Sequence, residues 1–143
     1  MKHLILLVED NPDDLVLLQR IIARTEPDNE TIIHIDISTA LAWLHESGRD
    51  HHGMPSLILL DLAFPQIDAV GFLQRLRSDS LTRNTPVVVY SNKSDTQVIA
   101  ACTASGCNSY VCKPARYADF AETTRQIIQY WLTINAVPRY GMT

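Results

Sequence analysis

Short apolar runs alternate along this chain with longer segments in which apolar residues recur at helical spacing. The runs are too short for helices bounded in this way, and two of them are rich in β-branched residues, so they predict buried strands. Five such runs occur, at residues 4–8, 31–35, 57–60, 87–90 and 110–112. Strands that alternate with helices favour a parallel sheet covered by helices on both faces.

The segments that follow these runs carry helix signals. Asn11 can cap the first helix, and Pro12 suits its first position. Asp13 and Asp14 come next in the sequence, in the first turn, where negative charge complements the helix dipole. Four further helices are predicted, at residues 39–46, 70–77, 95–105 and 118–132.

This order of elements predicts an α/β fold. We expect a flavodoxin-like, doubly wound five-stranded parallel sheet in the order 2-1-3-4-5, with five helices. Residues 47–56 predict a surface loop, and the helical period is lost after Asn135. The expected organisation is therefore one domain at residues 1–134 and a C-terminal tail at residues 135–143.

Composition narrows the classes of function. The net charge of −4 and the pI near 5.6 argue against a nucleic-acid-binding protein, which needs a basic face. No apolar run approaches the roughly 20 residues of a membrane span. The three cysteines are odd in number and spaced by five, which fits neither a disulfide framework nor a zinc site. We therefore expect a cytoplasmic protein with reduced thiols.

Polar residues follow four of the predicted strands. Glu9 and Asp10 come after the first strand, and Asp61 follows the third. Ser91 follows the fourth strand, and Lys113 follows the fifth. Because the carboxyl ends of parallel strands meet at one edge of the sheet, where such folds bind ligands, we expect these side chains to lie together.

Three clustered carboxylates predict a bound cation. Each pair at about 4 Å costs roughly 4 kcal/mol at an effective dielectric of about 20, and the single charge of Lys113 cannot offset three. A site of oxygen ligands suits Mg²⁺. Asp61 ends the central strand and is the best placed nucleophile toward phosphorus, with Lys113 and Ser91 near the transferring oxygens.

Several of these residues lie in motifs of a known family. Residues 8–11 (VEDN), 59–65 (LLDLAFP), 88–91 (VVYS) and 110–114 (YVCKP) resemble successive signatures of the CheY-like response-regulator receiver domain. Each motif alone is weak, but together they appear in order and at consistent spacing. The resemblance extends from about residue 3 to residue 133.

The resemblance implies roles for the acidic residues. Asp61 would be the phosphoacceptor. Glu9 and Asp10 would hold Mg²⁺ together with Asp61 and the backbone carbonyl of Ala63. One departure lies close by, because Asp68 is followed by Ala69 where receivers usually carry glycine.

The resemblance also implies roles at the fourth and fifth strands. Ser91 would be the switch hydroxyl, in place of the more frequent threonine, and Lys113 would bind the phosphoryl group. Tyr110 falls at the position of the switch aromatic, although a half-buried tyrosine with a structural role would look the same. Asn92 stands where a small residue is common.

The end of the chain carries a narrower resemblance. Residues 129–133 (QYWLT) and 137–138 (VP) resemble the C-terminus of single-domain regulators that partner bacterial phytochromes and related sensor histidine kinases. That family implies an isologous homodimer through residues 95–105, 110–112 and 118–132, extended by the tail. Output would then occur by protein contact or by onward phosphotransfer.

The predicted function is that of a stand-alone response regulator in a two-component phosphorelay. It would not be an enzyme beyond self-catalysed phosphoryl transfer and autodephosphorylation. A degenerate receiver that acts as an unphosphorylated scaffold is an alternative. An aspartyl phosphatase of the haloacid dehalogenase type would need an acid where Ala63 stands, and Glu9 and Asp10 would repel the phosphate of a flavodoxin-type cofactor.

Overall fold

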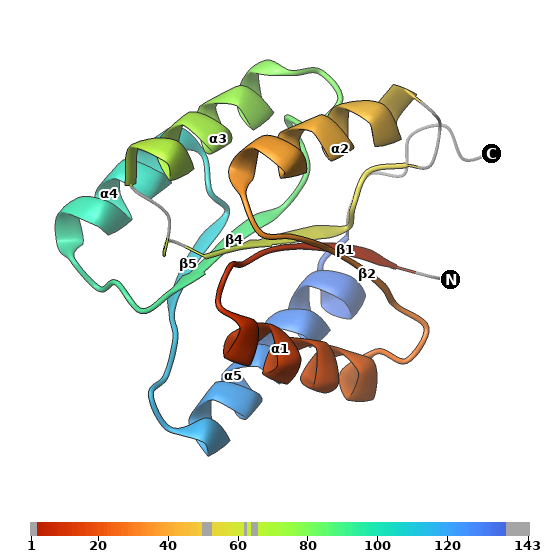
Figure 1. The fold of residues 1–143 in the computed structure, drawn as a ribbon, viewed down its shortest axis with the longest axis vertical. Coiled ribbons are helices and arrows are strands. Elements are labelled where there is room, and N and C mark those ends of the chain that lie inside the picture. Colours follow the sequence, from red (N-terminus) through yellow and green to blue (C-terminus); the bar gives the residue numbers. More distant parts are fainter. Residues whose placement is uncertain (1–2, 50–52, 62, 64–65, 137–143) are drawn as a thin grey trace.

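A five-stranded parallel sheet lies between two layers of helices in the computed structural model (Figure 1), which describes residues 3–49, 53–61, 63 and 66–136. The strands are β1 (Leu4–Val8), β2 (Glu30–His34), β3 (Leu57–Leu60), β4 (Val87–Ser91) and β5 (Ser109–Cys112). They are ordered β2-β1-β3-β4-β5, and each neighbouring pair is parallel. The predicted fold is confirmed.

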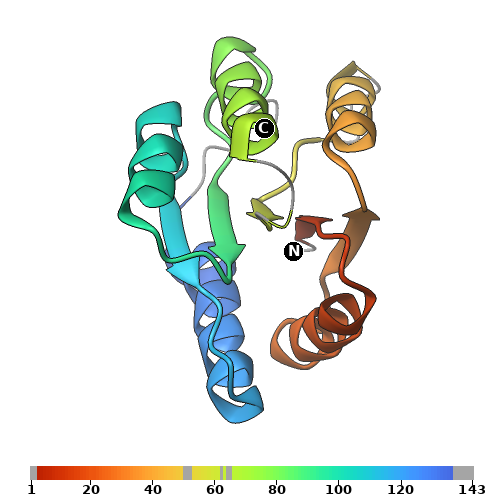
Figure 2. The same cartoon turned by 60° about the vertical axis from the view of Figure 1, so that its left-hand side comes forward.

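The helices cover the sheet unequally. They are α1 (Pro12–Thr25), α2 (Ile37–Arg49), α3 (Gln66–Ser78), α4 (Thr96–Ser105) and α5 (Tyr117–Gln129), which a π-helical turn, η1 (Tyr130–Ile134), follows. Helices α1 and α5 lie on one face, and α2, α3 and α4 lie on the other (Figures 1 and 2). In the described part of the chain, no helix has the length and apolar character of a membrane span.

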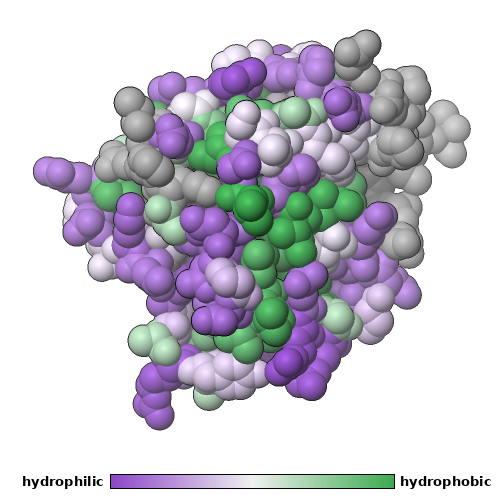
Figure 3. Space-filling model, in the orientation of Figure 1, coloured by the Kyte–Doolittle hydropathy of each residue, from purple (hydrophilic) through white to green (hydrophobic). Residues whose placement is uncertain are grey.

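Each face of the sheet builds its own core. Along β1, Ile5 and Leu7 pack toward α1 and α5, whereas Leu6 and Val8 pack toward α2 and α3. Successive side chains of a strand point to opposite faces, so a strand covered on both sides must be apolar throughout. This packing explains the continuous apolar runs. The solvent side of the helices is largely hydrophilic, with a narrow apolar band in the view of Figure 3.

The helix ends follow local signals. Asn11 Oδ1 accepts hydrogen bonds from the backbone N–H groups of Asp13, at 2.9 Å, and Asp14, at 3.1 Å. Pro12 occupies the first position of α1, as predicted. Gly106 ends α4 with a φ of 108°, a left-handed conformation that glycine adopts without steric cost.

Two predicted helices are longer than the sequence indicated. Helix α2 begins at Ile37 rather than at residue 39, because Asp36 Oδ1 accepts a 2.7 Å hydrogen bond from the Thr39 N–H and starts the helix earlier. It also continues to Arg49, so the predicted loop at 47–56 was wrong for residues 47–49. Helix α3 begins at Gln66, four residues before its predicted start.

The last predicted helix is not uniform. Helix α5 ends at Gln129, and the chain then widens into η1, where the Asn135 N–H donates to the Tyr130 carbonyl. The wider turn leaves Leu132 buried and Tyr130 exposed. Of the predicted tail, residues 137–143 lie outside the described residues, so the boundary at residue 134 stays a prediction.

Candidate functional site

The candidate site lies at the carboxyl edge of the sheet. Sheet hydrogen bonding continues one residue past the strands: Glu9 N–H donates to the His34 carbonyl, and Asp61 N–H donates to Val8. The Lys113 N–H donates to the Ser91 carbonyl at 2.7 Å. These bonds extend the hydrogen-bonding pattern of the sheet to Glu9, Asp61 and Lys113. Their side chains therefore project from a rigid support.

The predicted acidic residues come together. One carboxylate oxygen each from Glu9, Asp10 and Asp61 lies within 4.8 Å of the other two. Glu9 and Asp61 are 2% and 7% exposed, whereas Asp10 faces solvent. Three convergent oxygen donors with one open side suit a hard divalent cation that keeps part of its water shell. Ala63 lies in the exposed turn after Asp61, and a role for its carbonyl stays a prediction.

Lys113 is buried in the middle of this cluster. Its Nζ lies 2.5 Å from Glu9 Oε1, 2.9 Å from Asp14 Oδ2 and 3.5 Å from Asp61 Oδ2. One ammonium thus faces three carboxyl groups. Asp14 was predicted only as a helix-dipole residue, and its part in the site was missed. Its place in the first turn after β1 was the only signal in the sequence.

The ring of Tyr90 lies next to the Lys113 ammonium. The sequence did not predict this contact. The ring centroid of this fully buried tyrosine lies 5.9 Å from Lys113 Nζ. The Tyr90 hydroxyl shares a 2.9 Å hydrogen bond with Thr124 of α5, and its ring stacks on Phe120. Burial raises the pKa of Tyr90. The sequence presented Tyr90 only as a strand residue, because the residues that it contacts come from α5, a distant part of the chain.

Ser91 and Tyr110 are linked through the loop after β4. The buried Ser91 Oγ accepts a hydrogen bond from the Lys93 N–H at 3.1 Å. The Tyr110 hydroxyl donates to the Lys93 carbonyl at 2.6 Å. Burial raises the pKa of Tyr110, and a hydrogen bond with Ser91 opposes that rise. Their switch roles stay predictions, but both side chains hold the same loop residue.

Burial dominates the acid–base character of the site. It raises the pKa of Glu9 to about 8, with a contribution from Asp61 that Lys113 only partly offsets. Burial by itself would lower the pKa of Lys113, but hydrogen bonds to Asp14 and Glu9 raise it above its ordinary value. Lys113 therefore stays protonated. Glu9 also holds a proton near neutral pH unless a cation displaces it.

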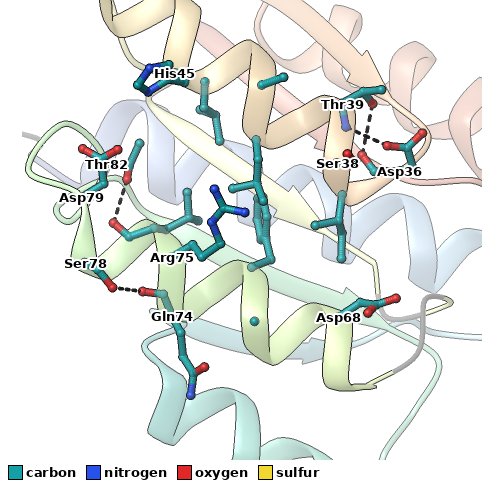
Figure 4. Close-up of a pocket in the computed structure, with 17 residues that line it drawn as sticks. Asp36, Ser38, Thr39, His45, Asp68, Gln74, Arg75, Ser78, Asp79 and Thr82 are labelled. Carbon is teal, nitrogen blue, oxygen red and sulfur yellow. Dashed lines mark hydrogen bonds between the residues drawn. The ribbon is translucent and has the colours of Figure 1, made fainter.

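A large groove lies elsewhere, between α2 and α3, and encloses about 1190 Å³ (Figure 4). Several of its polar groups form hydrogen bonds within the helices and at their ends. Asp36 caps α2, Ser78 donates to the Gln74 carbonyl, and Thr82 donates to the Leu76 carbonyl. This groove is a junction of two helices and does not include the acidic cluster.

Comparisons with known proteins agree with this geometry. The family model described as response regulator receiver domain matches residues 5–125. The probable methanogenesis regulatory protein FilR2 of Methanothrix harundinacea is 31% identical over 137 residues, which cover 94% of this chain and 87% of that protein.

Two solved structures are also similar. The phosphorylated cyanobacterial phytochrome response regulator RcpA has a TM-score of 0.88 and 30% identity, covering 97% of this chain and 100% of that one. The Mn²⁺-bound form of response regulator Rcp1 has a TM-score of 0.85 and 30% identity, covering 96% and 99%.

Proposed function

The chain belongs to the response regulator receiver domain family, and we propose that it acts as a stand-alone receiver in a two-component phosphorelay, with Asp61 as the phosphoacceptor. The observation that carries this proposal is the cluster of Glu9, Asp10 and Asp61 with Lys113 Nζ 3.5 Å from Asp61. The similar proteins FilR2 and RcpA match over most of their own length, which supports a receiver domain at residues 1–134.

The proposed reaction transfers a phosphoryl group from a kinase phosphohistidine. An Asp61 carboxylate oxygen attacks phosphorus, and the new O–P bond forms as the P–N bond breaks. The imidazole leaves with the bonding electron pair and takes up a proton. Lys113 and the Ser91 hydroxyl would donate hydrogen bonds to phosphoryl oxygens, since such transfer depends on positioning and charge stabilisation. In autodephosphorylation, water would attack phosphorus, the Asp61 O–P bond would break, and inorganic phosphate would depart, which returns Asp61 to its carboxylate.

The donor set fits Mg²⁺, which we propose as the cofactor. Glu9, Asp10 and Asp61, with the backbone carbonyl of Ala63, would hold it. When bound, the cation would offset the negative charge of the carboxylates and of the phosphoryl oxygens. The Mn²⁺-bound form of the similar Rcp1 supports a divalent cation at this site.

The signal would pass through the loop after β4. If the Ser91 hydroxyl turns to a phosphoryl oxygen, it gives up the Lys93 N–H, and Lys93 then keeps the contacts of Tyr110 and Cys112 with its carbonyl. Tyr110 would then give up its own bond to the Lys93 carbonyl and repack as the switch aromatic. Complete switching from 1:99 to 99:1 requires about 5.5 kcal/mol, which two or three charge-assisted hydrogen bonds of roughly 1.5–3 kcal/mol can supply.

The proposed partners follow from the same family. The similarity to RcpA favours a phytochrome-type sensor histidine kinase, whose use of ATP places the exchange in the cytoplasm. A downstream protein or phosphotransfer partner would read the switched state. We also propose a homodimer through α4, β5, α5 and the tail, because Tyr130 and Ile134 expose 47% and 70% of their surface after α5.

Acetyl phosphate with Mg²⁺ tests the proposed function directly. Mass spectrometry should show addition of one phosphoryl group to the wild-type chain and to Asp68→Asn, which removes an exposed carboxylate of α3. Asp61→Asn should remain unmodified. Phosphorylation that persists in Asp61→Asn, or that is absent from the wild type, would contradict the proposal, and the second outcome would favour an unphosphorylated scaffold.

A further inference from the structure

Asp14 differs from its neighbours in the first turn of α1. Its carboxylate lies 2.9 Å from Lys113 Nζ, and its side chain is 25% exposed. Asp13 is exposed on the adjacent position of the same turn. Both residues donate their backbone N–H groups to Asn11 Oδ1, so their contributions to the helix cap are alike. They differ in burial and in the contact that Asp14 makes with Lys113.

Asp14 also differs from the other partners of Lys113. Glu9 and Asp61 belong to the cluster whose oxygens converge within 4.8 Å, together with Asp10. A divalent cation held there would draw on the same carboxylates that now face the lysine ammonium. Asp14 lies outside that converging set. It is therefore the carboxylate that stays available to Lys113 when the cluster is filled.

A divalent cation in the acidic cluster would repel the Lys113 ammonium and favour its movement away from Asp61. The ammonium and a divalent cation repel each other, and lysine has a flexible four-carbon stem that can turn toward solvent. The ring of Tyr90, 5.9 Å away, offers a favourable face but no directional hydrogen bond. An ammonium has three donors, so one can bind Asp14 while the others meet a phosphoryl oxygen.

On the basis of the proposed function, we infer that Asp14 is a positioning residue that keeps Lys113 beside Asp61 when a divalent cation occupies the acidic cluster. The 2.9 Å hydrogen bond anchors Nζ on the α1 side. From there the ammonium lies 3.5 Å from Asp61 Oδ2, on which the phosphoryl group would form. Asp14 touches neither phosphorus nor metal and acts only through the lysine.

The sequence makes a direct test practical. Its lysines are Lys2, Lys93 and Lys113, so ¹H–¹⁵N spectra of the ammonium groups are simple to assign. A buried, hydrogen-bonded ammonium exchanges slowly with water, whereas an exposed one exchanges fast. With saturating Mg²⁺, the Lys113 signal should persist in the wild type and in Asp13→Asn. It should vanish in Asp14→Asn, and Asp14→Glu, which keeps the charge, should restore it.

Binding of beryllofluoride, a phosphoryl mimic, supplies the second measurement. In Mg²⁺, its affinity should fall by about tenfold in Asp14→Asn, as expected for loss of a charge-assisted hydrogen bond, and stay unchanged in Asp13→Asn. A persistent Lys113 signal in Asp14→Asn, or an affinity equal to that of Asp13→Asn, overturns the inference. If the wild type itself does not bind beryllofluoride, the proposed function fails, and the Lys113 signal still decides the role of Asp14.

Discussion

Tyr110 of β5 and Lys93 of the loop after β4 are joined by a 2.6 Å hydrogen bond from the tyrosine hydroxyl to the lysine backbone carbonyl. The same lysine donates its backbone N–H to Ser91 Oγ. Both side chains that were predicted to change with phosphorylation therefore hold one loop residue in the resting form. The loop cannot rearrange without breaking at least one of these bonds.

Replacing Tyr110 by phenylalanine removes one anchor and keeps the ring. The free energy of unfolding should fall by about 1 kcal/mol, the usual contribution of one hydrogen bond. Amide exchange at residues 92–95 should become faster in the unphosphorylated protein, as hydrogen-exchange mass spectrometry would show. Tyr117→Phe, at a site that is 55% exposed, is the control and should change neither quantity. Unchanged protection in Tyr110→Phe would contradict the anchoring role.

Glu9 should make the metal-free protein less stable as the pH rises. Its pKa is about 8 in the folded chain against 4.5 when unperturbed, so the folded state keeps a proton that the unfolded state has released between these values. Stability should therefore fall with rising pH across this window, by at most about 1.4 kcal/mol per pH unit. Urea denaturation in EDTA measures the slope. Glu9→Gln cannot ionise and should remove it; equal slopes in both proteins would refute the assignment.

The same proton links magnesium binding to pH. A cation that needs the Glu9 carboxylate must displace the proton, so Mg²⁺ affinity should rise toward pH 8, by at most about tenfold per unit. Calorimetric titration at pH 7 in two buffers of different ionisation enthalpy should reveal up to one released proton. Binding heats that do not depend on the buffer would show that Glu9 is already ionised.

The sequence predicts the strands, such as the one that ends at Val8, and the residues that follow them, such as Asp61. The apolar strands and their order were predictable because a strand buried on both faces, like β1, must be apolar throughout. The meeting of the polar residues that follow the strands was predictable for a second reason, since the carboxyl ends of parallel strands lie at one edge of the sheet. Glu9, Asp10, Asp61 and Lys113 indeed come together there.

Contacts between distant segments were not predictable in this way. Asp14 and Lys113 are 99 residues apart, and their pairing depends on the direction in which α1 leaves the sheet. Tyr90 meets Lys113 and Thr124 only because α5 packs on that face. The predicted start of α2 was wrong because Asp36 caps the helix with a contact that apolar periodicity does not reveal.

Arg77 of α3 binds the segments that precede β4 and β5, at the edge of the sheet opposite the acidic cluster. It should therefore be important for stability. Its guanidinium donates to the carbonyls of Gly106, Thr82 and Thr85 and to Asn108 Oδ1. Arg77→Met would leave several of these acceptors without their donor and should lower the free energy of unfolding by about 2–4 kcal/mol. Arg75→Met, on the exposed side of α3, should cost far less. Chemical denaturation compares the two, and similar losses would contradict the role of Arg77.

Polar substitution of the exposed apolar residues after α5 should weaken the proposed homodimer. Light scattering at high protein concentration should give the mass of two wild-type chains. Ile134→Ser removes a side chain that is 70% exposed, and if burial in a dimer contributes about 1.5 kcal/mol, dissociation should become about tenfold easier. Val16→Ser, on the exposed face of α1, removes a similar apolar surface outside the proposed interface. A monomeric wild type, with or without beryllofluoride, would refute the dimer, and equal effects of the two substitutions would place its interface elsewhere.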